Sequence, residues 1–137
     1  MWRLLVALSL GCTAAATSVP NNGAVTLGAR ELVLADRIRF STDGSELLQE
    51  SLPLLDSVGA ELVAHPSVTI EIQCHTDLRG SAEHALTLSQ ERVDAIRTYL
   101  MSRGVAPRRL LARGFGVTRP IADGEHRRCD LIRTDTP

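Results

Sequence analysis

The chain alternates short apolar runs with helix-like segments, and this order limits the folds it can adopt. Residues 31–40 end in an alternation of apolar side chains and arginines, which predicts a half-buried strand. Residues 68–74 form a second apolar run of strand length. Residues 109–115 and 126–133 are predicted as the third and fourth strands.

Two helices are predicted between these strands. The first begins near Ser51, a residue type that caps helices, has Pro53 in its first turn, and ends before Pro66. The second covers residues 89–103, where apolar residues recur at every third or fourth position, and Gly104 follows as a stop signal. The order β-α-β-α-β-β predicts an α+β fold: a two-layer sandwich with a mixed four-stranded sheet and both helices on one face. Strands joined through helices are expected to be parallel, and the last strand antiparallel.

The first 16 residues are predicted to be a bacterial export signal. One arginine precedes the apolar run 4–10, and small residues follow it. Ordinary signal peptidase would cleave after Ala16. The pair Gly11-Cys12 resembles the end of a lipoprotein box, which would make Cys12 an acylated N-terminus and attach the chain to the outer membrane. Both alternatives stay open.

Composition sets the remaining domain boundaries and excludes one class of partner. Residues 17–29 are small and polar and predict a flexible leader, residues 30–133 the folded domain, and residues 134–137 a short tail. The 15 basic and 16 acidic residues give a net charge of −1, whereas a nucleic-acid-binding domain carries a basic excess. All the basic residues are arginines, so every permanent cation is a planar guanidinium that suits carboxylates.

Two charged residues are placed to face one cleft. Asp77 lies just past the end of the second predicted strand, and Arg92 lies in the first turn of the helix that follows. These two places border the same cleft in an α/β unit, where ligands tend to bind. The two side chains could form a structural ion pair. They could also hold a zwitterion, with Asp77 accepting from an ammonium and Arg92 gripping a carboxylate.

The motifs around these residues resemble those of the OmpA-like C-terminal domain family, over about residues 30–132. In chain order they are Ile38-x-Phe40, His75-Thr76-Asp77, Leu88-Ser89-x-x-Arg92, Tyr99-Leu100-x-x-x-Gly104-Val105, Arg109-Leu110, Gly114-Phe115-Gly116, Pro120-Ile121 and Arg127-Arg128. Each motif alone is weak, but their order and spacing together are specific.

The resemblance implies a non-covalent peptidoglycan-binding module that tethers the outer membrane, or a periplasmic complex, to the cell wall. In such a module Asp77 contacts the head group of diaminopimelate in the stem peptide, and Arg92 pairs with its carboxylate. Backbone groups of Thr76 and Leu78 would assist, and Arg128 is a further candidate. The implied location is the periplasm, in association with the outer membrane.

Departures from the family pattern keep an alternative open. Cys74 replaces a common glycine, Ala85 and His126 replace common asparagines, and the loop between Pro120 and Arg127 is shorter than the family's usual loop. Loss of a side-chain amide from the pocket would remove about 1 kcal/mol of hydrogen bonding, which weakens binding without abolishing it. The alternative is a diverged OmpA-like module that no longer binds peptidoglycan and serves protein interaction instead.

The family fold also places the last strand antiparallel beside the second. This arrangement would bring Cys74 close to Cys129, so we expect a disulfide, with two small buried thiols as the alternative.

Cys74 and His75 alternate to opposite faces of their strand, which argues against a catalytic pair. We expect no catalytic residue, metal site or cofactor. The pairs Arg108-Arg109 and Arg127-Arg128 are interpreted as solvated faces or as a basic rim that attracts the anionic wall polymer.

Overall fold

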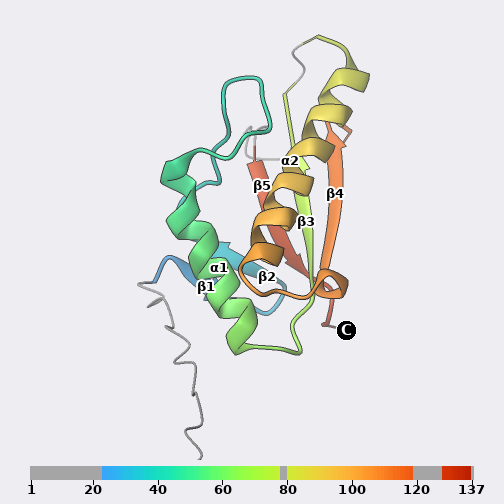
Figure 1. The fold of residues 1–137 in the computed structure, drawn as a ribbon. Coiled ribbons are helices and arrows are strands. Elements are labelled where there is room, and N and C mark those ends of the chain that lie inside the picture. Colours follow the sequence, from blue (N-terminus) through green and yellow to red (C-terminus); the bar gives the residue numbers. More distant parts are fainter. Residues whose placement is uncertain (1–22, 78–79, 119–127, 137) are drawn as a thin grey trace, which may run out of the picture.

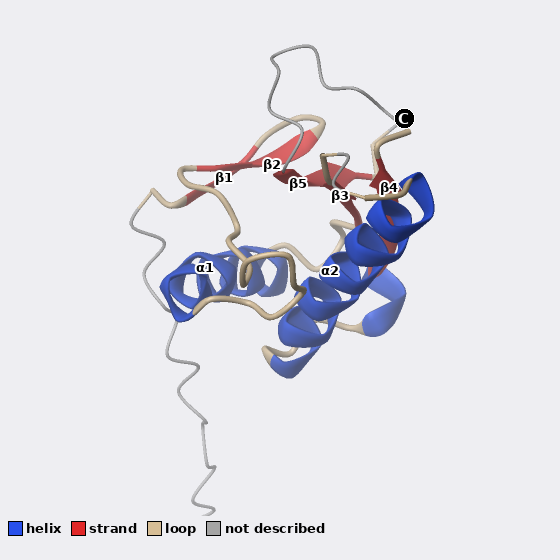
Figure 2. Ribbon diagram, turned by 90° about the horizontal axis from the view of Figure 1, so that it is seen from above, coloured by secondary structure: helices blue, strands red, loops and turns tan. Residues whose placement is uncertain are grey.

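The computed structural model describes residues 23–77, 80–118 and 128–136. The predicted export signal, Cys12, Leu78 and His126 lie outside these ranges. Two helices, α1 (Leu52–Ala64) and α2 (Ala82–Ser102), cover one face of a single sheet. Figure 2 shows both helices on the same side of the strands. Within the described ranges, no helix combines the length and the apolar character needed to cross a bilayer.

The sheet has the mixed pairing that the α+β prediction requires. Its strands are β1 (Val25–Leu27), β2 (Glu31–Leu34), β3 (Ile70–His75), β4 (Leu110–Gly116) and β5 (Arg128–Arg133), in the order β1-β2-β5-β3-β4. Strands β3 and β4 are parallel, and β5 lies between β2 and β3, antiparallel to both (Figure 1). The predicted fold class and the antiparallel last strand are confirmed.

The sheet has five strands, however, where four were predicted. Val25–Leu27, part of the predicted flexible leader, pairs antiparallel with β2. The tight turn between them is closed by the N–H of Gly28, which donates to the carbonyl of Glu31 at 2.9 Å. The sequence gives little indication of this strand, because only Val25 in it is fully buried and small polar residues precede it.

The predicted strand 31–40 also ends early, at Leu34. Beyond it the chain leaves the sheet, and Phe40 keeps only an isolated bridge to Leu47. The alternation of Ile38 and Phe40 therefore reflects apolar side chains that turn inward from a loop: Ile38 is buried and Phe40 is partly buried against the core.

Helix α2 begins seven residues before the predicted start. Ser81 caps it, since its hydroxyl accepts from the N–H of His84 at 3.1 Å. The first two turns bury only Ala85, so no apolar period marks them in the sequence. Further along, the predicted stripe of Val93, Ile96 and Leu100 is fully buried.

The core lies between the helices and the inward face of the sheet. Its fully buried members include Leu55, Val58, Leu62, Ile70, Ile72, Val93, Ile96, Leu100, Leu110 and Leu131. Burying side chains of this size stabilises a fold by about 1.5–3 kcal/mol each before chain entropy is counted. This packing holds the sheet end that carries the candidate site.

Arg109 has a role that its neighbour Arg108 does not share. Its guanidinium is buried and donates to the carbonyls of Leu62 (2.6 Å), His65 (2.8 Å) and Val68 (3.0 Å). These carbonyls belong to the last turn of α1 and to the segment that links α1 to β3, where helical N–H partners are missing. The interpretation of Arg109 as a solvated residue is therefore wrong, while Arg108 is exposed.

Candidate ligand-binding site

A small hollow of about 220 Å³ opens at the carboxyl end of β3. Thr76 and Asp77, which follow this strand, form one wall, and α2 forms the other. The loop between β2 and α1 closes the third side with Asp43. The remaining lining residues are His84, Ala85, Leu88 and Arg92.

Thr76 ties the strand end to its neighbours. Its N–H donates to the carbonyl of Gly116 at 3.0 Å, and its hydroxyl donates to the carbonyl of Ala85 at 3.2 Å. Thr76 is buried, so both bonds are shielded from water. They fix the backbone from which Asp77 projects.

The close approach of α2 to β4 depends on two glycines. A Cβ on Gly114 would collide with the backbone of Gln90, and one on Gly116 would lie 2.9 Å from the backbone nitrogen of Leu86. Gly116 also has a positive φ of 54°, which favours glycine. Its N–H donates to the hydroxyl of Ser89 at 2.8 Å. Helix α2 therefore lies directly on β4 beside the hollow.

Arg92 is oriented by the loop between β2 and α1. Its Nε donates to the carbonyl of Gly44 at 2.8 Å, and its guanidinium lies 5.0 Å from the ring centre of Phe40. The loop is folded tightly: Asp43 has a positive φ of 54°, which aspartate tolerates better than most residues. Because α2 starts at Ala82, Arg92 lies roughly three turns into the helix and not in its first turn.

Three of the predicted site residues line this one hollow: Thr76, Asp77 and Arg92. Leu78 lies outside the described residues. Arg128 does not line this hollow but borders two other hollows.

The sequence analysis named neither Asp43 nor His84 as a site residue, although both line the hollow. Asp43 belongs to a turn-forming segment, which carries no signal for ligand contact. It lines the hollow only because the loop folds back over α2.

A larger trough of about 750 Å³ adjoins the hollow and shares Asp43 and Arg92 with it. Its other wall carries Asp36, whose carboxylate accepts from the N–H of Arg37 at 2.7 Å. This hydrogen bond is the main cause of a lowered pKa of Asp36. The guanidinium of Arg39 lies 3.6 Å from Asp36 and adds to the effect.

Cys74 and Cys129 face each other directly in the β3–β5 register, with Cα atoms 4.0 Å apart. In the structure the two residues form a disulfide. It joins the end of β3, at a residue three positions before Asp77, to the start of β5.

The disulfide leads to a test in solution. When the unreduced chain is denatured and alkylated, we expect neither Cys74 nor Cys129 to be labelled. Reduction is expected to lower the free energy of unfolding by about 2–4 kcal/mol, because the unfolded chain gains freedom. A Cys74→Ser, Cys129→Ser double variant should lose this response to reductant. Labelling of both cysteines without reduction would contradict the bond.

The side chain of His75, the last residue of β3, packs against Phe115 of β4. The rings of His75 and Phe115 are stacked, with centroids 5.2 Å apart, and the guanidinium of Arg113 lies 5.5 Å from the centre of the Phe115 ring. His75 is buried. In the part of the chain that the structure describes, no group of three or more His, Cys, Asp or Glu side chains is placed to hold a metal ion.

Comparison with known proteins identifies the family. The model of the OmpA family matches residues 39–128, which include β3, α2 and β4. The chain belongs to the OmpA family. This OmpA-family chain is 32% identical over 133 residues to the peptidoglycan-associated lipoprotein of Rhizobium meliloti, covering 89% of this chain and 76% of the relative.

Two further comparisons agree. The peptidoglycan-associated lipoprotein of Haemophilus influenzae is 32% identical over 131 residues, covering 88% of this chain and 85% of that protein. The crystal structure of the peptidoglycan-associated lipoprotein from Burkholderia pseudomallei is 32% identical, with a TM-score of 0.66 over 74% of this chain and 92% of that one. The family resemblance found in the sequence motifs is confirmed.

Proposed function

We propose that this OmpA-family chain is a non-enzymatic, non-covalent peptidoglycan-binding module of the bacterial envelope. It tethers the outer membrane, or a periplasmic complex, to the wall. One observation carries the proposal: Asp77 and Arg92 line the same hollow in a chain of this family. The relatives named peptidoglycan-associated lipoproteins support it, because they align over most of the chain.

The proposed ligand is the diaminopimelate of the stem peptide, which presents an ammonium and a carboxylate on one carbon. Asp77 would accept hydrogen bonds from the ammonium, and Arg92 would donate to the carboxylate. Nε of Arg92 donates to the carbonyl of Gly44, so the guanidinium would meet the ligand from the wall of the hollow. Backbone groups of Thr76 and Leu78 would border the head group.

The contacts that orient Arg92 reduce the conformational entropy that its side chain would lose on ligand binding. Its contacts with Gly44 and Phe40 hold the guanidinium on the wall of the hollow before ligand arrives. A pre-oriented side chain loses less conformational freedom on binding. Capture then requires no rearrangement of the core.

We also propose that residues 1–16 direct export to the periplasm. Acylation of Cys12 would attach the module to the outer membrane, and the leader that follows would let it reach the wall. Cleavage after Ala16 would leave a soluble periplasmic module. The mass of the mature N-terminus, measured from the native host, distinguishes the two.

The function can be tested by sedimentation with purified sacculi. We expect the exported chain to sediment with sacculi that contain diaminopimelate. Free meso-diaminopimelate should release it, whereas 1,5-diaminopentane, which has the two ammonium groups and no carboxylate, should not. A chain that stays in the supernatant would contradict the proposal and favour the diverged protein-interaction module.

A further inference from the structure

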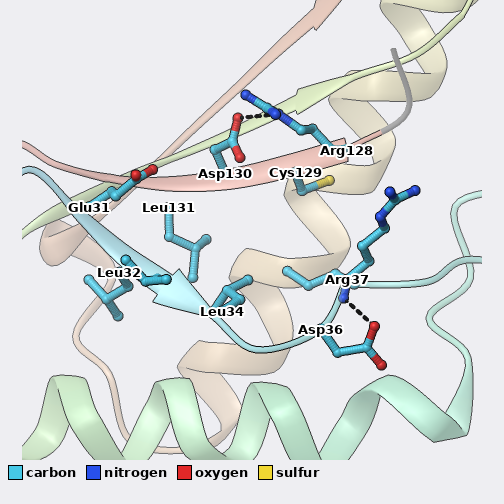
Figure 3. A pocket seen from close by; sticks show the side chains of 11 residues that line it. Glu31, Leu32, Leu34, Asp36, Arg37, Arg128, Cys129, Asp130 and Leu131 are labelled. Atoms are coloured by element: carbon cyan, nitrogen blue, oxygen red, sulfur yellow. Dashed lines mark hydrogen bonds and ion pairs between the residues drawn. The ribbon is translucent and has the colours of Figure 1, made fainter. Parts of the chain in front are cut away.

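The start of β5 is held in the sheet from one side. Strand β5 pairs with β2 only at Leu131 and Ile132, because the chain leaves the sheet beyond Leu34. Among the described residues, residues 128–130 pair only with β3. A hollow of about 470 Å³ lies between β2 and this part of β5, and Figure 3 shows Cys129 at its border. We call this hollow the gap.

The same strand pair carries the residues that lead to Asp77. Cys74 of β3 pairs with Cys129, and His75, the last residue of β3, pairs with Arg128. On the other side of β3, the register with β4 shifts between Cys74 and His75. Such a shift interrupts the regular hydrogen bonding of a sheet. The regular pairing of this strand end is therefore with β5, and the disulfide reinforces it.

The two halves of the disulfide differ in exposure. Cys74 is fully buried in the core. Cys129 is half-buried, and it lines both the gap and the trough. The trough also borders the hollow at Asp77, with which it shares Asp43 and Arg92. A reductant can therefore approach the bond at Cys129, from the trough beside the ligand site.

Breaking the bond would displace the start of β5. Two thiols need more space than a disulfide, because their sulfur atoms are no longer bonded to each other. Cys74 is enclosed by the core, whereas Cys129 borders the gap, so the strand at Cys129 is the part with room to move. That movement would loosen the pairing of Arg128 with His75, which lies two residues before Asp77.

We propose that the Cys74–Cys129 disulfide is a redox switch of the ligand site. The oxidised chain holds Asp77 in the position that captures the ligand, and reduction lowers the affinity while the domain stays folded. The switch rests on the proposed function, because the change is read through the ligand at Asp77. The domain stays folded because the loss of one disulfide typically costs less than the whole stability of a domain of this size.

The reductant required is a dithiol, such as a dithiol protein of the cell envelope. Its thiolate attacks Sγ of Cys129, the S–S bond breaks, and the electron pair passes to Sγ of Cys74, which takes up a proton. The second thiol of the reductant then attacks the mixed disulfide, which releases Cys129 as a thiol and leaves the reductant as a disulfide. Reduced chains would thus be released from the wall, and reoxidation would restore attachment.

The test compares the affinity of the exported chain for free meso-diaminopimelate before and after treatment with dithiothreitol. We expect reduction to weaken binding at least about tenfold, because a small displacement of a contacting group is enough for such a loss. The far-UV circular dichroism should stay unchanged, and reoxidation should restore the affinity. Cys129→Ala, which leaves Cys74 as a thiol, should bind as weakly as the reduced chain and should not respond to dithiothreitol.

Arg109→Lys is the matched control for stability. Arg109 lies at the opposite end of the sheet, next to Leu110, which pairs with Ile70 at the start of β3. The variant should lose stability but keep the parent affinity and the parent response to dithiothreitol. Equal losses of affinity in Arg109→Lys and Cys129→Ala would show a general effect of stability and would overturn the switch.

Two further outcomes separate the switch from the proposed function. If the reduced chain and Cys129→Ala bind as tightly as the oxidised parent, or if reduction unfolds the domain, the switch is wrong while the Asp77 site stands. If the oxidised parent does not bind diaminopimelate, both proposals are overturned.

Discussion

Arg92→Ala is expected to abolish sedimentation of the chain with peptidoglycan sacculi. Removing one partner of a hydrogen-bonded charge pair typically costs 2 kcal/mol or more, about a 30-fold loss of affinity. The loss should be large here because the guanidinium also fastens the loop through Gly44 and Phe40. That loop brings Asp43 to the wall of the hollow.

Asp77→Asn tests, in the same assay, the effect of the side-chain charge apart from that of its volume. The variant keeps the volume of the side chain but removes the charge that would meet the ligand ammonium, so we expect a comparable loss. Arg30 is exposed and does not line the hollow, so Arg30→Ala should sediment as the parent does. Urea denaturation should show whether each variant keeps its stability. If Arg92→Ala and Asp77→Asn both sediment normally, the site is misassigned.

Arg109→Leu is expected to lower the free energy of unfolding by about 3–5 kcal/mol. The substitution leaves the carbonyls of Leu62, His65 and Val68 without the donor that the structure gives them. The bonds to Leu62 and Val68 are buried, and an unsatisfied buried group costs about 1–3 kcal/mol. A domain of this size is typically stable by about 5–15 kcal/mol, so the variant should be close to unfolding at elevated temperature.

The neighbouring Arg108 provides the matched control, since it is exposed. Arg108→Leu should change the midpoint of urea unfolding little, by about 0.5 kcal/mol or less in free energy. Arg109→Lys keeps the charge but not the fork of donors, so it should recover only part of the loss. Equal stability of the Arg108→Leu and Arg109→Leu variants would show that the three hydrogen bonds contribute nothing.

Periodicity predicted the elements whose burial follows a regular pattern. Val93, Ile96 and Leu100 recur at helical spacing, and all three are buried. Alternate residues of β3, such as Ile70 and Ile72, face the core. In these segments the local pattern and the tertiary packing agree, so the prediction needed no knowledge of the rest of the chain.

The prediction was incomplete where burial depends on a distant partner. Val25 is buried only because β1 pairs with β2 and lies over α1. The early turns of α2 are exposed on most sides and carry no apolar period. Arg109 is buried because the end of α1 lies against it, an arrangement of residues more than 40 positions apart in sequence.

The sequence by itself determined the alternation of strands and helices, and it placed Asp77 directly after a buried strand. Only the tertiary structure decided that Asp43 joins this residue and Arg92, and that the separation of β2 from β5 opens a gap beside Arg128. The reason is physical: a strand or helix follows from neighbours in the chain, whereas a hollow is the space left where packed elements diverge. Its shape depends on contacts between residues far apart in sequence, which no local pattern records.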